Sequence, residues 1–392
     1  MLRLTLDNQP LDVPPGTTIL EAARRLGIEI PTLCHRAGYP AQTSCLVCLV
    51  RVNGGARLLP ACATPVAEGM GVESETEEVH AARRTALELL LGDHLGDCQG
   101  PCQSMCPAHL DIPRMLRLVG EGRPAEAATL AREALVLPTT LGYVCPALCE
   151  KGCRRGALDR AVAIRETHRA LGERILREGP AAPLAAEPTG KRVAIIGGGP
   201  AGLAAAYGLL RTGHACALFE EQQALGGQLW LSIPPERLPR EVLAAEAEAV
   251  VRRGAELHLG VRVGHGTTLD NLRGEFDAVL VATGSRDSAP GADLGLAGGD
   301  RVQADRRTHL TDLPGVFVAG AALAPTHEAV RAVASGLSAA HALTLFLAGQ
   351  PPAAVARPWG VHMGQLSAEE LAACAESLPP ASGGEPAAEA AR

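Results

Sequence analysis

The stretch RVAIIGGGPAGLAAAYGLLRTGHACALFE, residues 192–220, decides the fold of the largest part of the chain. Its apolar run predicts a buried strand, the glycines a tight turn, the alanine-rich segment a helix, and ACALFE a second strand. Gly197, Gly199 and Gly202 give the pattern G-x-G-x-x-G between strand and helix. The stretch therefore predicts a βαβ unit of a Rossmann-like α/β domain.

Each glycine of this pattern has a physical purpose in binding a dinucleotide. The first makes the turn, the second lets the backbone approach a pyrophosphate, and the third lets helix and strand pack closely. Pro200 and Ala201 belong to the same loop, and Glu220 ends the second strand, where a carboxylate can bond an adenosine ribose. The alternative is a strand–helix turn without a ligand; strand, helix and acid together favour a nucleotide.

The α/β pattern continues along the chain. The segments that predict further strands and a long helix are 255–263, 276–285, 315–320 and 326–349. We expect this domain to span residues 191–350, preceded by a Pro/Ala-rich linker at 178–190. Residues 351–392 are predicted to be a Pro/Ala-rich tail with one short capped helix that begins near Ser367.

Two smaller domains are predicted before the linker. Residues 1–75 predict an α+β unit: LRLTL and LDVPPG are strands, and TILEAARRLG is a helix with a capping box at Thr18 and Glu21 and a stop at Gly27. Residues 76–178 predict a mainly helical domain. Its expected helices lie within 77–94, 112–134 and 161–178, the second of them broken near 122–124.

The charge of the 392-residue chain excludes several classes of partner. A net charge of −7 and a pI near 6 give no electrostatic case for nucleic acid or an anionic membrane. The N-terminus has no apolar h-region and no run of 18 apolar residues exists, so we expect neither a secretory signal nor a transmembrane segment. A cytoplasmic protein is expected, and stable disulfides are rare there.

The twelve cysteines need an explanation other than disulfides. Ten fall in three groups, at 34/45/48/62, 98/102/106 and 145/149/153. In a reducing compartment such grouping favours metal binding. Cys216 and Cys374 stand alone, which is typical of inert thiols.

The first group has the spacing C-x10-C-x2-C-x13-C. Four thiolates satisfy two irons bridged by two sulfides; the alternative is a structural zinc site, which usually pairs two short C-x2-C elements. IPTLCHRAGYPAQTSCLVCLVRVNGG and LLPACATPVAEGM resemble the N-terminal [2Fe–2S] domain of the iron–sulfur subunit of respiratory complex I and of related hydrogenase and formate dehydrogenase subunits. The resemblance implies a β-grasp, ferredoxin-like fold with Cys34, Cys45, Cys48 and Cys62 as ligands.

The second and third groups carry another resemblance. DHLGDCQGPCQSMCPAHLDIP (93–113) and GYVCPALCEKGCRRG (142–156) resemble the helical domain shared by the glutamate synthase small subunit and dihydropyrimidine dehydrogenase, which holds two [4Fe–4S] clusters. The resemblance implies one cluster on Cys98, Cys102 and Cys153, and another on Cys106, Cys145 and Cys149.

Each of these clusters needs a fourth ligand. The family's first run usually has four cysteines; here there are three, and His94 stands where the missing ligand should be. An imidazole can ligate cluster iron, although a capping or surface histidine is the alternative. The second cluster's fourth ligand comes, in the family, from the following helix, often as Gln or Glu. His168 falls near that place, with Glu166 two residues before it, and a packed or exposed helix histidine is the alternative.

The nucleotide is predicted to be FAD. ALGGQLWLSIPPERLPREVL (224–243) resembles the flavin-contacting segment of the glutamate synthase small subunit. This resemblance adds contacts at five positions: Gly227, Gln228, Thr283, Gly284 and Gly320. In that family an NADPH domain follows the ATG strand; here the gap is too short for a domain, and no second glycine fingerprint is present. The family's last strand usually ends in Gly-Asp, whose carboxylate bonds the flavin's ribityl chain, but Ala321 follows Gly320 here.

Taken together, the motifs predict an electron-transfer subunit of an oxidoreductase. It would carry one [2Fe–2S] cluster, two [4Fe–4S] clusters and FAD, with no catalytic acid, base or nucleophile. We expect it to dock onto a catalytic partner of the formate dehydrogenase or hydrogenase type and to link it to ferredoxin or another carrier. Two alternatives remain: a self-sufficient NAD(P)H:acceptor oxidoreductase, and a scaffold that no longer binds flavin.

Overall fold

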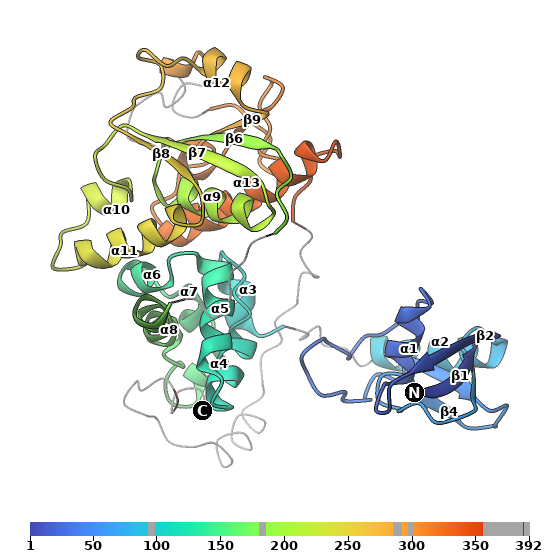
Figure 1. The fold of residues 1–392 in the computed structure, drawn as a ribbon. Helices are drawn as coiled ribbons and strands as arrows, with labels where there is room; N and C mark the ends of the chain where they lie inside the picture. Colours follow the sequence, from blue (N-terminus) through green and yellow to red (C-terminus); the bar gives the residue numbers. More distant parts are fainter. Residues whose placement is uncertain (93–98, 180–185, 285–291, 297–301, 356–386, 388–392) are drawn as a thin grey trace. The chain divides into compact units, whose positions relative to one another are not determined.

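The computed structural model describes residues 1–92, 99–179, 186–284, 292–296, 302–355 and 387 (Figure 1). The chain divides into two compact units, Met1–Asp97 and Cys98–Arg392. The helix predicted near Ser367 lies outside the described residues.

The first unit is a five-stranded mixed sheet with two helices in its described part. Its elements are β1 (Leu2–Leu6), β2 (Gln9–Val13), α1 (Ile19–Arg25), β3 (Leu49–Val52), β4 (Leu58–Pro60), β5 (Met70–Glu73) and α2 (Glu77–Gly92). The sheet order is β2-β1-β5-β3-β4, in which β1 pairs antiparallel with β2 and parallel with β5.

Local sequence signals explain how this unit begins. Leu6 pairs with Gln9, so Asp7 and Asn8 form a two-residue hairpin turn, and both have the positive φ that such turns require. The capping box of α1 is present: Thr18 and Glu21 exchange side-chain and backbone hydrogen bonds. The first strand and the first helix are therefore confirmed, whereas the second strand spans Gln9–Val13 instead of 11–16, because the turn takes only two residues.

The second unit starts with helices. They are α3 (Pro101–Met105), α4 (Ile112–Gly120), α5 (Pro124–Leu135), α6 (Pro138–Val144), α7 (Leu148–Lys151), the 3-10 turn η1 (Arg154–Ala157) and α8 (Ile164–Glu178). Proline stands in the first or second position of α3, α4, α5 and α6, where its missing N–H costs nothing. The predicted break between α4 and α5 is confirmed.

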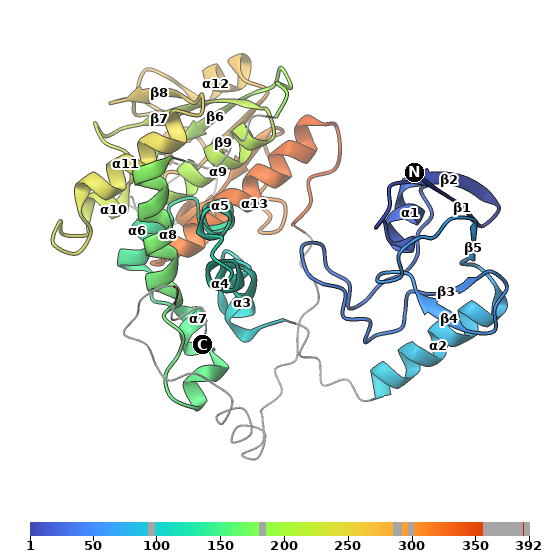
Figure 2. The ribbon, with the colours of Figure 1, turned by 60° about the horizontal axis from the view of Figure 1, so that its bottom comes forward.

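A five-stranded parallel sheet follows, in the order β10-β9-β6-β7-β8. Its strands are β6 (Arg192–Ile196), β7 (Ala215–Glu220), β8 (Glu256–Leu259), β9 (Ala278–Val281) and β10 (Val316–Val318). The helices and 3-10 turns of this part are α9 (Pro200–Arg211), α10 (Gln228–Leu231), α11 (Arg240–Val251), α12 (Leu269–Glu275), η2 (Ala292–Leu294), η3 (Gly320–Ala322) and α13 (Ala329–Leu347). Figures 1 and 2 show the layer of α9, α11 and α13 between the sheet and the helices α4–α8.

Side chains of the sheet alternate between two apolar clusters, as the pleat dictates. Val193 and Ile195 join the cluster that also contains α9, α13 and residues of α4–α8, whereas Ala194 and Ile196 face the α12 side. The predicted buried strand is therefore covered on both faces, as parallel strands usually are.

Helix α13 is long and apolar enough to cross a membrane by length and composition. Its small residues pack against α9: a Cβ added at Gly336 would lie 2.1 Å from the carbonyl oxygen of Ala201. Val333 and Leu343 are buried in the core of the unit. In this structure α13 occupies the place of a core helix, and no other described helix meets the same criterion.

Candidate redox-cofactor sites

A pocket of about 560 Å³ opens at the carboxyl edge of the parallel sheet. Residues at or just beyond the ends of β6, β7 and β9 line it, among them Ile196, Glu220 and Ala282. This edge is where open α/β sheets bind nucleotides, and the volume lies within the usual range of ligand pockets.

The glycine loop forms the floor of this pocket. Gly197 has φ +110°, and a Cβ there would lie 2.5 Å from the carbonyl oxygen of Ala282. A Cβ on Gly202 would lie 1.9 Å from the carbonyl oxygen of Gly197, so helix and strand are in contact at this point. A Cβ on Gly199 would meet no atom closer than 3.9 Å. The backbone there is open to a ligand at the amino end of α9.

Glu220 ties this loop to the end of β7. Its Oε2 accepts a hydrogen bond from the Gly198 N–H at 2.7 Å, and its Oε1 accepts one from the Gln222 N–H at 2.8 Å. The side chain is buried and lines the pocket. The carboxylate therefore holds the glycine loop in place, and each oxygen keeps a further lone pair that can accept another hydrogen bond.

Most of the other predicted nucleotide contacts also line the pocket. They are Pro200, Ala201, Gly227, Gln228, Thr283 and Gly284. Gly202 and Gly320 are not among the lining residues: the first packs helix on strand, and the second donates its N–H to Ser335 Oγ at 2.8 Å. Ala321, at the position where the resemblance implies an aspartate, lines the pocket.

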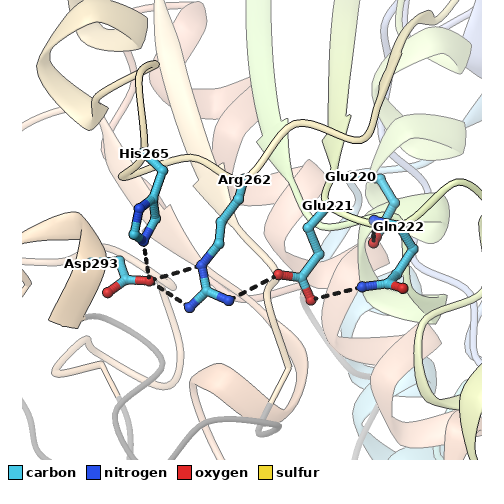
Figure 3. A network of polar contacts seen from close by, with 6 residues as sticks. All are labelled: Glu220, Glu221, Gln222, Arg262, His265 and Asp293. Carbon is cyan, nitrogen blue, oxygen red and sulfur yellow. Dashed lines mark hydrogen bonds and ion pairs between the residues drawn. The ribbon is translucent and has the colours of Figure 1, made fainter.

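An ionic network that no sequence motif signals lies on the pocket wall (Figure 3). The Arg262 guanidinium lies between Glu221 (3.3 Å) and Asp293 (2.6 Å), and His265 lies 3.5 Å from the same aspartate. The hydrogen bonds to Arg262 hold the pKa of Asp293 below its usual range. These residues follow β7, follow β8 and lie in η2, so no single segment of sequence signals the network.

The first cysteine group comes together in the N-terminal unit. The Cys34 N–H donates to Cys45 Sγ at 3.4 Å, and three of the four thiols are buried. Burial, the Cys48 thiol and the charges of the other two cysteines raise the pKa of Cys62 to about 12. The sulfurs of this group are a donor set that a cationic iron–sulfur cluster stabilises as thiolates.

Cys106, Cys145 and Cys149 line a second, small cavity together with His168. Burial raises the pKa of all three thiols, and the neighbouring cysteines add to the effect for Cys145 and Cys149. Glu166 does not line this cavity; it pairs with Arg165 and Arg169.

The His168 ring is fixed in one tautomer. Its Nδ1 lies 2.9 Å from the carbonyl oxygen of Pro138, which can only accept, so Nδ1 carries the proton. Burial lowers the pKa of His168 to about 4, so the ring is neutral and Nε2 keeps its lone pair. A neutral imidazole held by a backbone carbonyl is the usual state of a metal-ligating histidine, and three thiols with this imidazole fit a four-ligand cluster.

The remaining predicted ligands are only partly described. Burial is the main cause that raises the pKa of Cys102 to about 11, and the charge of Cys153 adds to it. Cys102 and Cys153 therefore lie close to one another. Cys98 and His94 lie outside the described residues. Within the described residues, no set of three His, Cys, Asp or Glu side chains converges on a single metal ion.

The start of α13 separates the pocket from the second cavity. Glu328 and Ala329 line the pocket, whereas Val330 lines the cavity of Cys106, Cys145 and Cys149. The pKa of Cys145 is raised chiefly by burial, then by the charge of Cys106 and, to a smaller extent, by the charge of Glu328. One turn of chain, residues 328–330, is therefore a wall common to both sites.

Comparison with protein families accounts for this arrangement. Three family models match: a 2Fe-2S iron-sulfur cluster binding domain at residues 1–77, dihydropyrimidine dehydrogenase domain II with its 4Fe-4S cluster at 76–179, and pyridine nucleotide-disulphide oxidoreductase at 191–321. The chain joins three redox modules. This confirms the predicted resemblance and the predicted cofactors, which are one [2Fe–2S] cluster, two [4Fe–4S] clusters and FAD.

Curated proteins similar to this three-module chain are themselves redox proteins. It is 39% identical over 219 residues to the NADP(+)-dependent formate dehydrogenase subunit beta of Moorella thermoacetica, covering 49% of this chain and 31% of the relative. It is 36% identical over 199 residues to the NADPH-Fe(3+) oxidoreductase subunit beta of Geobacter sulfurreducens, covering 50% of this chain and 29% of the relative.

A third relative is the glutamate synthase [NADPH] small chain of Escherichia coli K12, at 38% identity over 189 residues, which are 47% of this chain and 40% of the relative. The match to each of these relatives spans less than half of the relative's length.

Proposed function

We propose that this chain is an electron-transfer component of a larger oxidoreductase, in which its flavin and its clusters form one path. The observation that carries the proposal is the common wall of residues 328–330 between the dinucleotide pocket and the cavity of Cys106, Cys145 and Cys149. When bound, FAD exchanges electrons singly or in pairs and iron–sulfur clusters move them one at a time.

We assign the cluster ligands from the thiols that lie together. Cys34, Cys45, Cys48 and Cys62 hold the [2Fe–2S] cluster; Cys106, Cys145, Cys149 and His168 hold one [4Fe–4S] cluster. Cys102 and Cys153 contribute to the other, with Cys98 and His94 as its remaining ligands. The buried, neutral and hydrogen-bonded state of His168 supports its role.

We assign the flavin site to the glycine loop and its neighbours. The open backbone at Gly199 and the amino end of α9 receive the pyrophosphate. Glu220 orients the loop and bonds the ribose. Gly227, Gln228, Thr283 and Gly284 line the rest of the site. These groups bind and orient the cofactor; none of them transfers a proton in this proposal.

The partner is proposed to be a catalytic subunit of the formate dehydrogenase or hydrogenase type in the cytoplasm, with ferredoxin or another carrier as the second partner. The name of the Moorella relative supports the first class. Only residues 282–315 join β9 to β10, which leaves no room for the NADPH domain that the glutamate synthase small subunit inserts there.

The test is anaerobic purification from the native host with identification of co-purifying subunits. We expect about ten iron atoms and one FAD per chain, and a redox subunit in the complex. Addition of NADPH to the isolated chain provides the discriminating measurement. Prompt loss of the flavin absorbance would favour a self-sufficient NADPH oxidoreductase, and a chain without flavin would favour a scaffold.

A further inference from the structure

Glu246 is a buried carboxylate that the proposed function does not use. It lies on α11, in the flavin-binding part of the unit, and only 5% of its surface is exposed. Its Oε1 accepts a hydrogen bond from the Thr139 N–H at 2.8 Å, and its Oε2 accepts one from the Thr140 N–H at 2.7 Å. A helix of the flavin part thus holds the first turn of α6 in the cluster part.

The same turn of α6 orients His168. Pro138, the first residue of α6, supplies the carbonyl that accepts from His168 Nδ1 at 2.9 Å. Helix α6 also touches helix α8, which carries His168: a Cβ added at Gly172 on α8 would lie 2.3 Å from Thr139 Oγ1 on α6. A shift of the start of α6 would therefore move the carbonyl that fixes the imidazole.

The amino end of helix α11 is hydrogen-bonded to the wall of the dinucleotide pocket. Arg240, its first residue, donates from Nη1 to the Leu229 carbonyl at 3.1 Å and from Nη2 to the Ile233 carbonyl at 2.6 Å. Leu229 and Ile233 both line the pocket. Hydrogen bonds thus connect the pocket wall to α11, α11 to α6, and α6 to His168.

We propose that Glu246 is a positioning residue, which holds the His168 imidazole toward the cavity of Cys106, Cys145 and Cys149 by fixing the start of α6. The inference rests on the proposed role of His168 as a cluster ligand. Outer partners of metal-bound histidines fix the ring's orientation, and their loss typically costs 10- to 100-fold in metal affinity. Here the outer partner is Pro138, and Glu246 acts through it.

The test compares E246Q with E248Q in the holoprotein. The amide introduced by E246Q keeps one carbonyl acceptor but turns an NH₂ group toward the second threonine N–H, so one of the two hydrogen bonds is lost. Glu248 lies on the same helix with an exposed side chain paired to Arg252, which makes E248Q a matched control. Both proteins are labelled with ¹⁵N-histidine, and the hyperfine coupling of the reduced cluster is measured by pulsed EPR.

In the unchanged protein we expect a His168 coupling, which is the part of the imidazole signal that H168A removes while the coupling of His94 on the other cluster remains. E246Q should weaken or split the His168 coupling and release the iron of that cluster to a chelator about tenfold faster, whereas E248Q should do neither. A purely structural role would lower the unfolding temperature without altering the coupling. If E246Q does not fold, E246D, which keeps the charge but is one methylene shorter, is measured in the same way.

Two results would overturn the inference at different points. Without an imidazole coupling sensitive to H168A in the unchanged protein, His168 is not a ligand, and the proposed ligand set fails together with the inference. A coupling that is present but identical in E246Q, with an unchanged rate of iron release, leaves the ligand set intact and refutes the positioning role alone.

Discussion

Replacing Ala321 by aspartate should tighten FAD binding. Ala321 lines the dinucleotide pocket directly after Gly320, at the position where the resemblance to the glutamate synthase small subunit implies a carboxylate. The side chain is only partly buried, so a carboxylate there keeps some water and costs little desolvation. One charge-assisted hydrogen bond contributes about 1.5–3 kcal/mol, which is a Kd about 10- to 100-fold lower.

The assay is titration of flavin-free protein with FAD, followed by the quenching of flavin fluorescence. A321N is the matched control, because it adds a side chain of the same size with only a neutral hydrogen bond, for which about 0.5–1.5 kcal/mol is expected. A gain in affinity cannot come from misfolding. If A321D binds FAD no more tightly than A321N, then the acid is not what this pocket lacks, and the assignment of the flavin's orientation is wrong.

Three further predictions concern separate parts of the molecule. C62S should remove about two iron atoms per chain and leave the flavin in place. The control is C216S, because Cys216 is a buried thiol whose pKa is raised by burial alone, and this variant should keep its full iron content in metal analysis. G202A places a methyl group against the Gly197 carbonyl and should lower stability by about 1–3 kcal/mol with loss of FAD, measured by denaturant unfolding and flavin content. His309 is buried with Nδ1 2.9 Å from the Val318 carbonyl oxygen, and burial lowers its pKa. As the pH falls, His309 therefore takes up a proton in the unfolded chain before it does so in the folded chain. The free energy of unfolding should fall as the pH drops below about 6.5. In H309N that part of the pH dependence should disappear from the urea-unfolding midpoints. An unchanged slope of the midpoint against pH would contradict the assignment of this dependence to His309.

Local signals made much of the fold predictable. The capping box at Thr18 and the proline at the start of α5 are short-range devices, and each lies where the sequence predicts it. The parallel sheet follows from the glycine loop, because a strand, a turn and a helix in that order dictate a βαβ crossover. The spacing of the cysteines marked the three groups, but the joining of Cys106 with Cys145 and Cys149 was implied only by the family resemblance, because these thiols belong to different sequence groups.

The contacts that join the sites could not be predicted in this way. Arg262 meets Glu221 and Asp293 only because three segments that are distant in sequence end at one edge of the sheet. Glu246 has no periodic or motif signal, since a charged residue on an amphipathic helix is ordinarily exposed. A single sequence shows the residue types, but only the packed structure shows which charges become buried partners.

The helices α4–α8 and the parallel sheet share one apolar core, although a Pro/Ala-rich segment joins them in sequence. Leu141 and Ile164 from the helices and Leu203 and Phe317 from the α/β part belong to the same buried cluster. A flexible linker alone would let two cofactor sites drift relative to one another, and electron transfer between them would then depend on diffusion of one domain. Because the core is continuous, packing fixes the separation of the two sites. The start of α13 can serve as a common wall only under this condition, so the proposed electron path between the flavin and the cluster beside His168 requires no domain movement.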